Sequence, residues 1–146
     1  MKSELNCLTS FFEYSPHEGK QYFVPTWQNK TSLTDKAVRY FESRMIQQKT
    51  LNKMKVFSDM EFMPQFQKEI EVICFPYFFN EKLINIKYRG ANKSFKLVSG
   101  AELVFYNIDC LKDFIEVIIV EGEIDALTFV EHEFNNVISV PNGANK

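Results

Sequence analysis

The residues best suited to chemistry lie in one short stretch, VIIVEGEIDALTFV. Glu121 and Asp125 are one helical turn apart, so both carboxylates can face the same crevice. Gly122 allows a tight turn with close approach of the backbone, and Glu123, between the two acids, is expected to point elsewhere. Two hard carboxylates suit Mg²⁺ or Mn²⁺, which can hold nucleotide phosphates and neutralise charge in phosphoryl transfer.

The same pattern has a purely structural interpretation. The helix macrodipole favours acidic side chains in the first turn of any helix. An isolated E-G-x-x-D therefore leaves a metal site and an ordinary helix start both open.

A strand–helix–strand unit is predicted to position the two acids. The apolar runs at 116–120 and 137–140 are typical of buried parallel strands, and residues 121–134 between them are predicted to be helical. This order is a βαβ unit. Ligands of such folds bind outside the carboxyl ends of the strands, which is where Glu121 lies.

Upstream, the pattern predicts helices and then an antiparallel sheet. Residues 1–30 are interpreted as an N-terminal arm or linker. A helix follows in SLTDKAVRYFESRMI, with Thr34 as its N-cap, and a second short helix is expected at 50–55. Four segments then form a meander with one solvated face, namely EIEVICFPYFF, LINIKYR, SFKLV and ELVFY.

Four basic residues belong to this sheet region. Lys87 and Arg89 share one strand face, and Lys93 and Lys96 follow in the next segment. They form a local positive patch on a chain of net charge −2, as phosphate binding requires. The alternative is a solvated face that is polar for solubility, which we favour for Lys93 and Lys96.

Composition limits the class of protein. The 146 residues are 45% hydrophobic and 25% charged, as in soluble globular proteins, and the net charge argues against a wholly basic nucleic-acid coat. Three distant cysteines without a C-x-x-C pair predict neither a zinc site nor disulfides. Without a signal peptide or membrane-length apolar run, we expect a soluble, cytoplasmic protein.

The order of motifs resembles the Toprim-domain DNA primases. EGEIDAL followed by VISVPNGA is similar to the first half of a Toprim domain, most of all that of the phage primase-helicase and Twinkle group. Upstream, DKAVRYFESRMI with TLNKMKV, and then CFPYFFNEKLINIKYRGANKSFKLVSGAELVFYNID, resemble the primase RNA-polymerase domain. The likeness runs from about Pro25 to the C-terminus.

The resemblance implies an α+β fold. A small helical subdomain and an antiparallel sheet, at 31–114, would lead into a truncated Toprim βαβ unit at 115–146. The Toprim Asp-x-Asp strand, a zinc-binding module and a G-x-x-x-x-G-K-[ST] motif do not occur in the sequence. The chain is therefore expected to be a fragment, inactive by itself, and the edge of its incomplete parallel sheet could pair with another copy.

The resemblance also implies roles for particular residues. Glu121 matches the motif glutamate, a metal ligand or general base, and Asp125 matches the supporting metal ligand. Lys87 and Arg89 match the basic surface for template or nucleotide, with Lys93 and Lys96 as plausible additions. The loop with Asn142 and Gly143 lies beside the acidic site, where Gly143 either admits a phosphate or only forms the turn.

The implied function of the parent protein is RNA-primer synthesis on single-stranded DNA. Its expected partners are the template, ribonucleotides and a replicative helicase domain in cis or in trans, in a bacterial cytoplasm or a phage-infected cell. Two alternatives stay open. One is another Toprim enzyme, a nuclease or a topoisomerase, and the other is a non-catalytic module that binds nucleic acid or a helicase.

Overall fold

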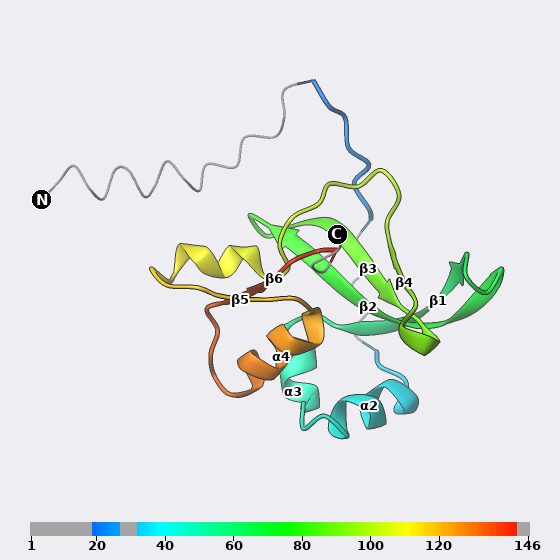
Figure 1. The fold of residues 1–146 in the computed structure, drawn as a ribbon, viewed down its shortest axis with the longest axis horizontal. Helices are drawn as coiled ribbons and strands as arrows, with labels where there is room; N and C mark the ends of the chain where they lie inside the picture. The colour runs from blue at the N-terminus through cyan, green and yellow to red at the C-terminus, as the bar shows by residue number, and fades with distance from the viewer. Residues whose placement is uncertain (1–18, 27–31, 143–146) are drawn as a thin grey trace, which may run out of the picture.

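The structure is a computed structural model that describes residues 19–26 and 32–142 (Figure 1). The predicted arm therefore lies largely outside the described residues. Helix α2, Asp35–Glu42, follows its N-cap Thr34, whose side-chain oxygen accepts a hydrogen bond from the backbone N–H of Ala37. The predicted N-cap is thus confirmed. Helix α3, Gln48–Lys53, begins and ends two residues earlier than predicted.

Four antiparallel strands follow in the order β1-β2-β3-β4. Their bounds are Phe57–Met63, Lys68–Phe79, Lys82–Arg89 and Phe95–Leu97, and the 3-10 helix η1, Ala91–Lys93, precedes the last strand. The turn between β2 and β3 lies at Asn80 and Glu81, and both residues adopt positive φ, at 50° and 63°. Sequence reasoning did not identify β1, the outer strand.

The prediction of a strand at ELVFY in this sheet is wrong. Residues 102–105 belong to no strand, and Tyr106 makes an isolated antiparallel bridge to Ser139. The physical reason is the side chain of Asn85, which donates to the Glu102 carbonyl at 2.8 Å and accepts from the Val98 N–H. The Asn85 side chain thus occupies main-chain groups that would otherwise pair with a neighbouring strand. The segment then continues to the sheet of β5 and β6, where Tyr106 meets Ser139.

The βαβ unit is confirmed. After the 3-10 helix η2, Ile108–Lys112, come β5, Ile118–Val120, α4, Glu123–Glu131, and β6, Val137–Ser139. The two strands pair in parallel. The predicted burial of the first strand is wrong, since Ile119 is 63% exposed. The buried side chains of the unit belong to α4 and β6, and β5 adds only the partly buried Ile118 and Val120 to the core.

One hydrophobic core joins the helical part to the βαβ unit. It contains Phe41 of α2, Leu51 of α3, Phe75 and Tyr77 of β2, and Leu127 of α4. Figure 1 shows the three helices gathered on one side of the sheet. The core therefore crosses residue 114, where we placed a domain boundary, and that boundary stays a prediction.

A second, smaller core lies on the opposite face of β2. Val72 and Cys74 point into it, whereas Ile73, Phe75 and Tyr77 face the first core, which is the period-two alternation of a strand. The predicted solvated face is wrong at the centre of β3, where Asn85 and Lys87 are buried at 1% and 8% exposure.

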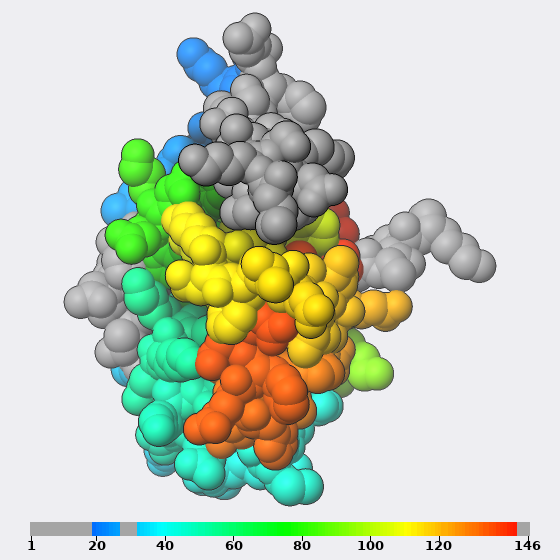
Figure 2. Space-filling view, turned by 90° about the vertical axis from the view of Figure 1, so that its left-hand side faces the viewer, coloured from blue at the N-terminus to red at the C-terminus, as the bar shows by residue number. Residues whose placement is uncertain are grey.

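The segment around η2 covers the end of the βαβ unit. Figure 2 shows it directly above the end of α4 and the loop that follows. The Asn107 side chain donates to the Val137 carbonyl at 2.9 Å, which fixes this contact. No helix within residues 19–26 and 32–142 is long and apolar enough to cross a membrane.

Candidate active-site cleft

A cleft of about 830 Å³ lies between the antiparallel sheet and the start of α4. Basic side chains line one side and acidic ones the other. The lining includes Arg44, Lys87, Arg89, Lys93, Lys96, Glu121, Glu123, Asp125 and Asn142. All predicted site residues except Gly143, which lies outside the described residues, therefore come together in one place.

Glu121 and Asp125 are exposed at the end of β5 and in the first turn of α4. Gly122 between them has φ −130°, which any residue can adopt, so the turn does not need glycine for its backbone. A Cβ there would lie 3.2 Å from Oδ2 of Asp125, so an alanine would require the Asp125 carboxylate to move by a few tenths of an ångström. The Asp125 carboxylate thus folds back over the turn that carries Glu121.

Glu123 lines the cleft but was not predicted as a site residue. It is 4% exposed, and one carboxylate oxygen accepts hydrogen bonds from the Tyr77 hydroxyl and, at 2.9 Å, from the Lys87 ammonium. Burial, together with the charge of Glu123, raises the pKa of Tyr77 far above its usual range, so this hydroxyl remains a donor. The apolar residues Ile124, Ala126 and Leu127 around it were the only sequence sign that this turn is buried.

Lys87 lies inside the cleft wall rather than on its surface. Besides Glu123, its ammonium donates to the Pro141 carbonyl at 2.8 Å. The centroid of the Phe95 ring lies 5.2 Å from the same nitrogen. The amine that we expected to bind phosphate is therefore engaged within the protein.

Two arginines are held by aromatic rings. The Arg89 guanidinium lies 5.6 Å from the ring centroid of Tyr40 and 5.0 Å from that of Phe95. Arg44 lies 5.1 Å from the same tyrosine. Stacking fixes a guanidinium while its N–H edge stays available for phosphate oxygens. Arg44 was not predicted, although its four-residue spacing from Tyr40 on a predicted helix was a visible signal.

Two proteins of Arabidopsis thaliana match the chain over 115 residues. A "Twinkle homolog protein, chloroplastic/mitochondrial" is 38% identical, and a "Primase homolog protein" is 36% identical. Each match covers 77% of this chain, but only 15% of the Twinkle homolog and 32% of the primase homolog. The chain thus spans a third or less of these relatives. No protein-family model matches the sequence.

Solved structures agree on the fold. A DnaG catalytic core has a TM-score of 0.55 at 12% identity, covering 74% of this chain and 47% of that one. A DnaG primase catalytic domain bound to single-stranded DNA has a TM-score of 0.54 at 11% identity, covering 77% and 50%.

The chain is similar to these two relatives, one named as a Twinkle homolog and one as a primase homolog, and it has the fold of the DnaG catalytic core. The expected α+β class is confirmed with it. The acidic turn and the basic residues of the sheet line the same cleft.

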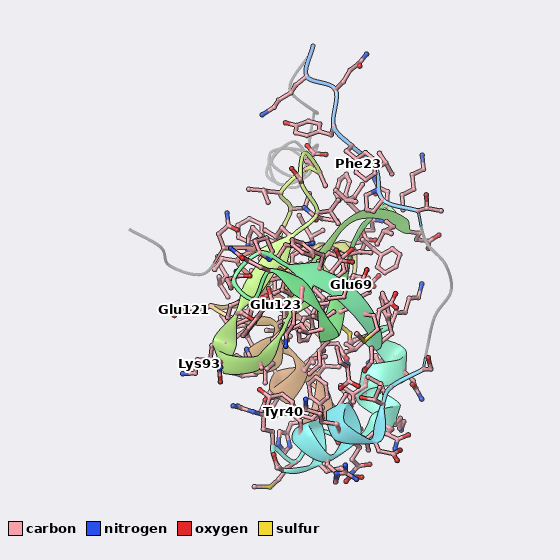
Figure 3. The ribbon with its side chains drawn as sticks, turned by 90° about the vertical axis from the view of Figure 1, so that its right-hand side faces the viewer. Phe23, Tyr40, Glu69, Lys93, Glu121 and Glu123 are labelled. Atoms are coloured by element: carbon pink, nitrogen blue, oxygen red, sulfur yellow. The ribbon has the colours of Figure 1, made fainter. Side chains whose placement is uncertain are left out.

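The two remaining lysines of the cleft differ in their contacts. Lys93 is exposed on η1, and Figure 3 shows it on the same side of the molecule as Glu121. Lys96 is bonded to the Glu61 carboxylate and, at 2.7 Å, to the Phe62 carbonyl. It therefore ties β4 to the β1 end of the sheet, although it also lines the cleft.

Glu121 and Asp125 are the residues that could hold a metal. Both are exposed carboxylates at the cleft, and Mg²⁺ is commonly bound by one or two carboxylates plus waters and substrate phosphates. Within the described part of the chain, no three His, Cys, Asp or Glu side chains gather for a metal. The pair fits a Mg²⁺ ion that phosphate ligands help to hold, and no zinc cluster is present among these residues.

Proposed function

We propose that this chain forms part of the active site of a DNA primase. The reaction is the joining of ribonucleotides into short RNA primers on single-stranded DNA. One observation carries the proposal, namely that Glu121 and Asp125 face the stacked arginines Arg44 and Arg89 across one cleft. Carboxylates for a divalent ion and cations for phosphates are the two groups that nucleotidyl transfer needs.

Each side of the cleft has its own task. Glu121 and Asp125 hold the divalent ion, which when bound neutralises charge on the reacting phosphates. Glu121 also lies in an exposed position suited to accept the proton of the attacking 3′-hydroxyl. Arg44 and Arg89 bind template or nucleotide phosphates, with Lys93 as a further exposed cation. The Asn142 loop borders the same space.

We propose that the 146 residues by themselves synthesise RNA primers weakly or not at all. Two exposed carboxylates form a poor metal cage by themselves, so a metal here would need further ligands such as substrate phosphates. The proposed partners are single-stranded DNA, ribonucleotides and a helicase domain, and the names Twinkle and DnaG primase of the similar proteins support them. The proposed location is wherever that template is replicated, and the cytoplasmic expectation remains untested.

A second candidate function is nucleic-acid binding without catalysis. It is favoured by the arrangement of the cations, because stacked arginines bind phosphate whether or not the acids hold a metal. A nuclease or topoisomerase is less well supported, since the similar proteins are named as primases and Twinkle.

The test is synthesis by the full-length protein on single-stranded DNA. Labelled ribonucleotides with Mg²⁺ are expected to give short oligoribonucleotides, and omission of Mg²⁺ or of template is expected to abolish them. Template binding without any product in Mg²⁺ or Mn²⁺ would exclude the primase and leave the binding module.

A further inference from the structure

Lys87 joins three segments that are distant in sequence. It projects from β3, its ammonium lies 2.9 Å from Oε1 of Glu123 at the start of α4, and 2.8 Å from the Pro141 carbonyl after β6. The Lys87 and Glu123 side chains are 10% and 4% exposed. Each buried charge therefore depends on the other, because a buried charge without its partner is strongly destabilising.

Both segments that Lys87 contacts carry residues of the cleft. Glu123 lies between Glu121 and Asp125, so the bond to Glu123 orients the turn that presents the two acids. Pro141 immediately precedes Asn142. The Tyr77 hydroxyl, which projects from β2, donates a hydrogen bond to the same Glu123 carboxylate oxygen. Two neighbouring strands of the antiparallel sheet therefore contact the first turn of α4. Figure 3 shows Glu123 in the interior and Glu121 at the edge.

We infer that Lys87 is a positioning residue, which fixes both loops of the cleft through Glu123 and Pro141 instead of contacting phosphate. An ammonium has three donors, and two of these are used within the protein. A phosphate near Lys87 would also meet the Glu123 carboxylate, which repels it. This inference deepens the proposed function for the cleft, but the link between the segments is testable without any activity.

Amide hydrogen exchange tests the link directly on the chain as it stands. Lys87→Met is expected to speed exchange about tenfold at 120–126 and 139–142, because the loss of a charged buried hydrogen bond frees both loops. Lys112→Met is the matched control. That lysine is exposed and paired with Asp109 at 3.3 Å, and its loss is expected to leave both loops unchanged. Unchanged exchange in Lys87→Met would overturn the inference.

A double variant separates positioning from stability alone. Lys87→Met combined with Glu123→Met removes both charges and keeps apolar volume, so it is expected to be more stable than Lys87→Met. The two loops are expected to remain fast in exchange, since the link is still missing. A folded double variant with wild-type exchange in both loops would contradict the inference.

The salt dependence of single-stranded DNA binding excludes the phosphate-contact alternative. Loss of one phosphate contact lowers the slope of log K against log salt by about 0.7 for single strands. Arg89→Met is expected to show this decrease and Lys87→Met to keep the wild-type slope. An equal decrease in both variants would overturn the inference. If no variant and no wild type binds DNA, the proposed function fails while hydrogen exchange still decides the role of Lys87.

Discussion

Tyr77 and Tyr106 pack edge to face with ring centroids 5.2 Å apart, and their hydroxyls differ in what they meet. Both side chains are buried, at 0% and 1% exposure. The Tyr77 hydroxyl donates to Glu123, whereas the Tyr106 hydroxyl has no hydrogen-bond partner among the described residues. The two tyrosines thus share one core and differ in whether the hydroxyl is hydrogen-bonded.

Removal of the Tyr77 hydroxyl is expected to destabilise the fold. Tyr77→Phe should lower the free energy of unfolding by about 1.5–3 kcal/mol, the usual range for a hydrogen bond to a charged group. Tyr106→Phe is the control and should be nearly neutral or stabilising, because it removes a buried hydroxyl that lacks a partner. Urea denaturation of both variants measures this. A cost for Tyr106→Phe equal to that of Tyr77→Phe would contradict the assignment.

Arg44 is expected to bind phosphate although it belongs to the helical part. Arg44→Met should weaken binding of a labelled single-stranded oligonucleotide and reduce its salt slope by about 0.7. Arg39→Met, in the preceding helix α2 and also exposed but outside the cleft lining, should change neither. Fluorescence anisotropy across a salt series gives both values, and matching slopes for the two variants would refute the role of Arg44.

Alanine in place of Gly122 is expected to lower activity, whereas alanine in place of Gly100 is expected to lower stability. Gly122→Ala crowds the Asp125 carboxylate at 3.2 Å, so primer synthesis should fall with little change in melting temperature. Gly100 has φ +74°, so Gly100→Ala strains the backbone and should cost stability of about 1 kcal/mol. Synthesis assays and thermal melts separate the two, and a destabilised Gly122→Ala would contradict the spatial role of this glycine.

Asp109 is expected to make stability depend on pH. Burial raises the pKa of its carboxyl, but the N–H groups of Glu81 and Asn80, and Lys112, outweigh this and hold it below its usual range. A lowered folded-state pKa contributes stability above the unfolded value of about 3.9, which is lost as pH falls through the folded value. Asp109→Asn should lower stability at pH 7 and lessen the loss between pH 5 and 2. Parallel pH curves for both proteins would exclude this.

The acidic turn and its βαβ setting were predictable because their signals are local. An apolar run, E-G-x-x-D and a second apolar run occur in uninterrupted order, and each element follows from its own period. Thr34 was predictable for the same reason, since a cap acts within three residues. The order of these motifs also carried the resemblance that the similar proteins bear out.

The pair Lys87 and Glu123 was not predictable, because it depends on how β3 meets α4. Strand alternation placed Lys87 on a face, but not whether solvent or α4 covers that face. The apolar run at 116–120 predicted a buried strand, but Ile119 in this run is exposed. Whether an apolar strand residue is buried depends on the element that packs against its strand, and the composition of the strand does not give that element.

The most direct test of the proposed primase is Glu121→Gln in the full-length protein. Glu116→Gln is the matched control, an exposed acid before the opposite end of β5 and outside the cleft. Both variants and the wild type are compared for oligoribonucleotide synthesis on single-stranded DNA with Mg²⁺. The account predicts that product is lost in Glu121→Gln while DNA binding persists, and that Glu116→Gln matches wild type. Undiminished synthesis by Glu121→Gln would contradict it.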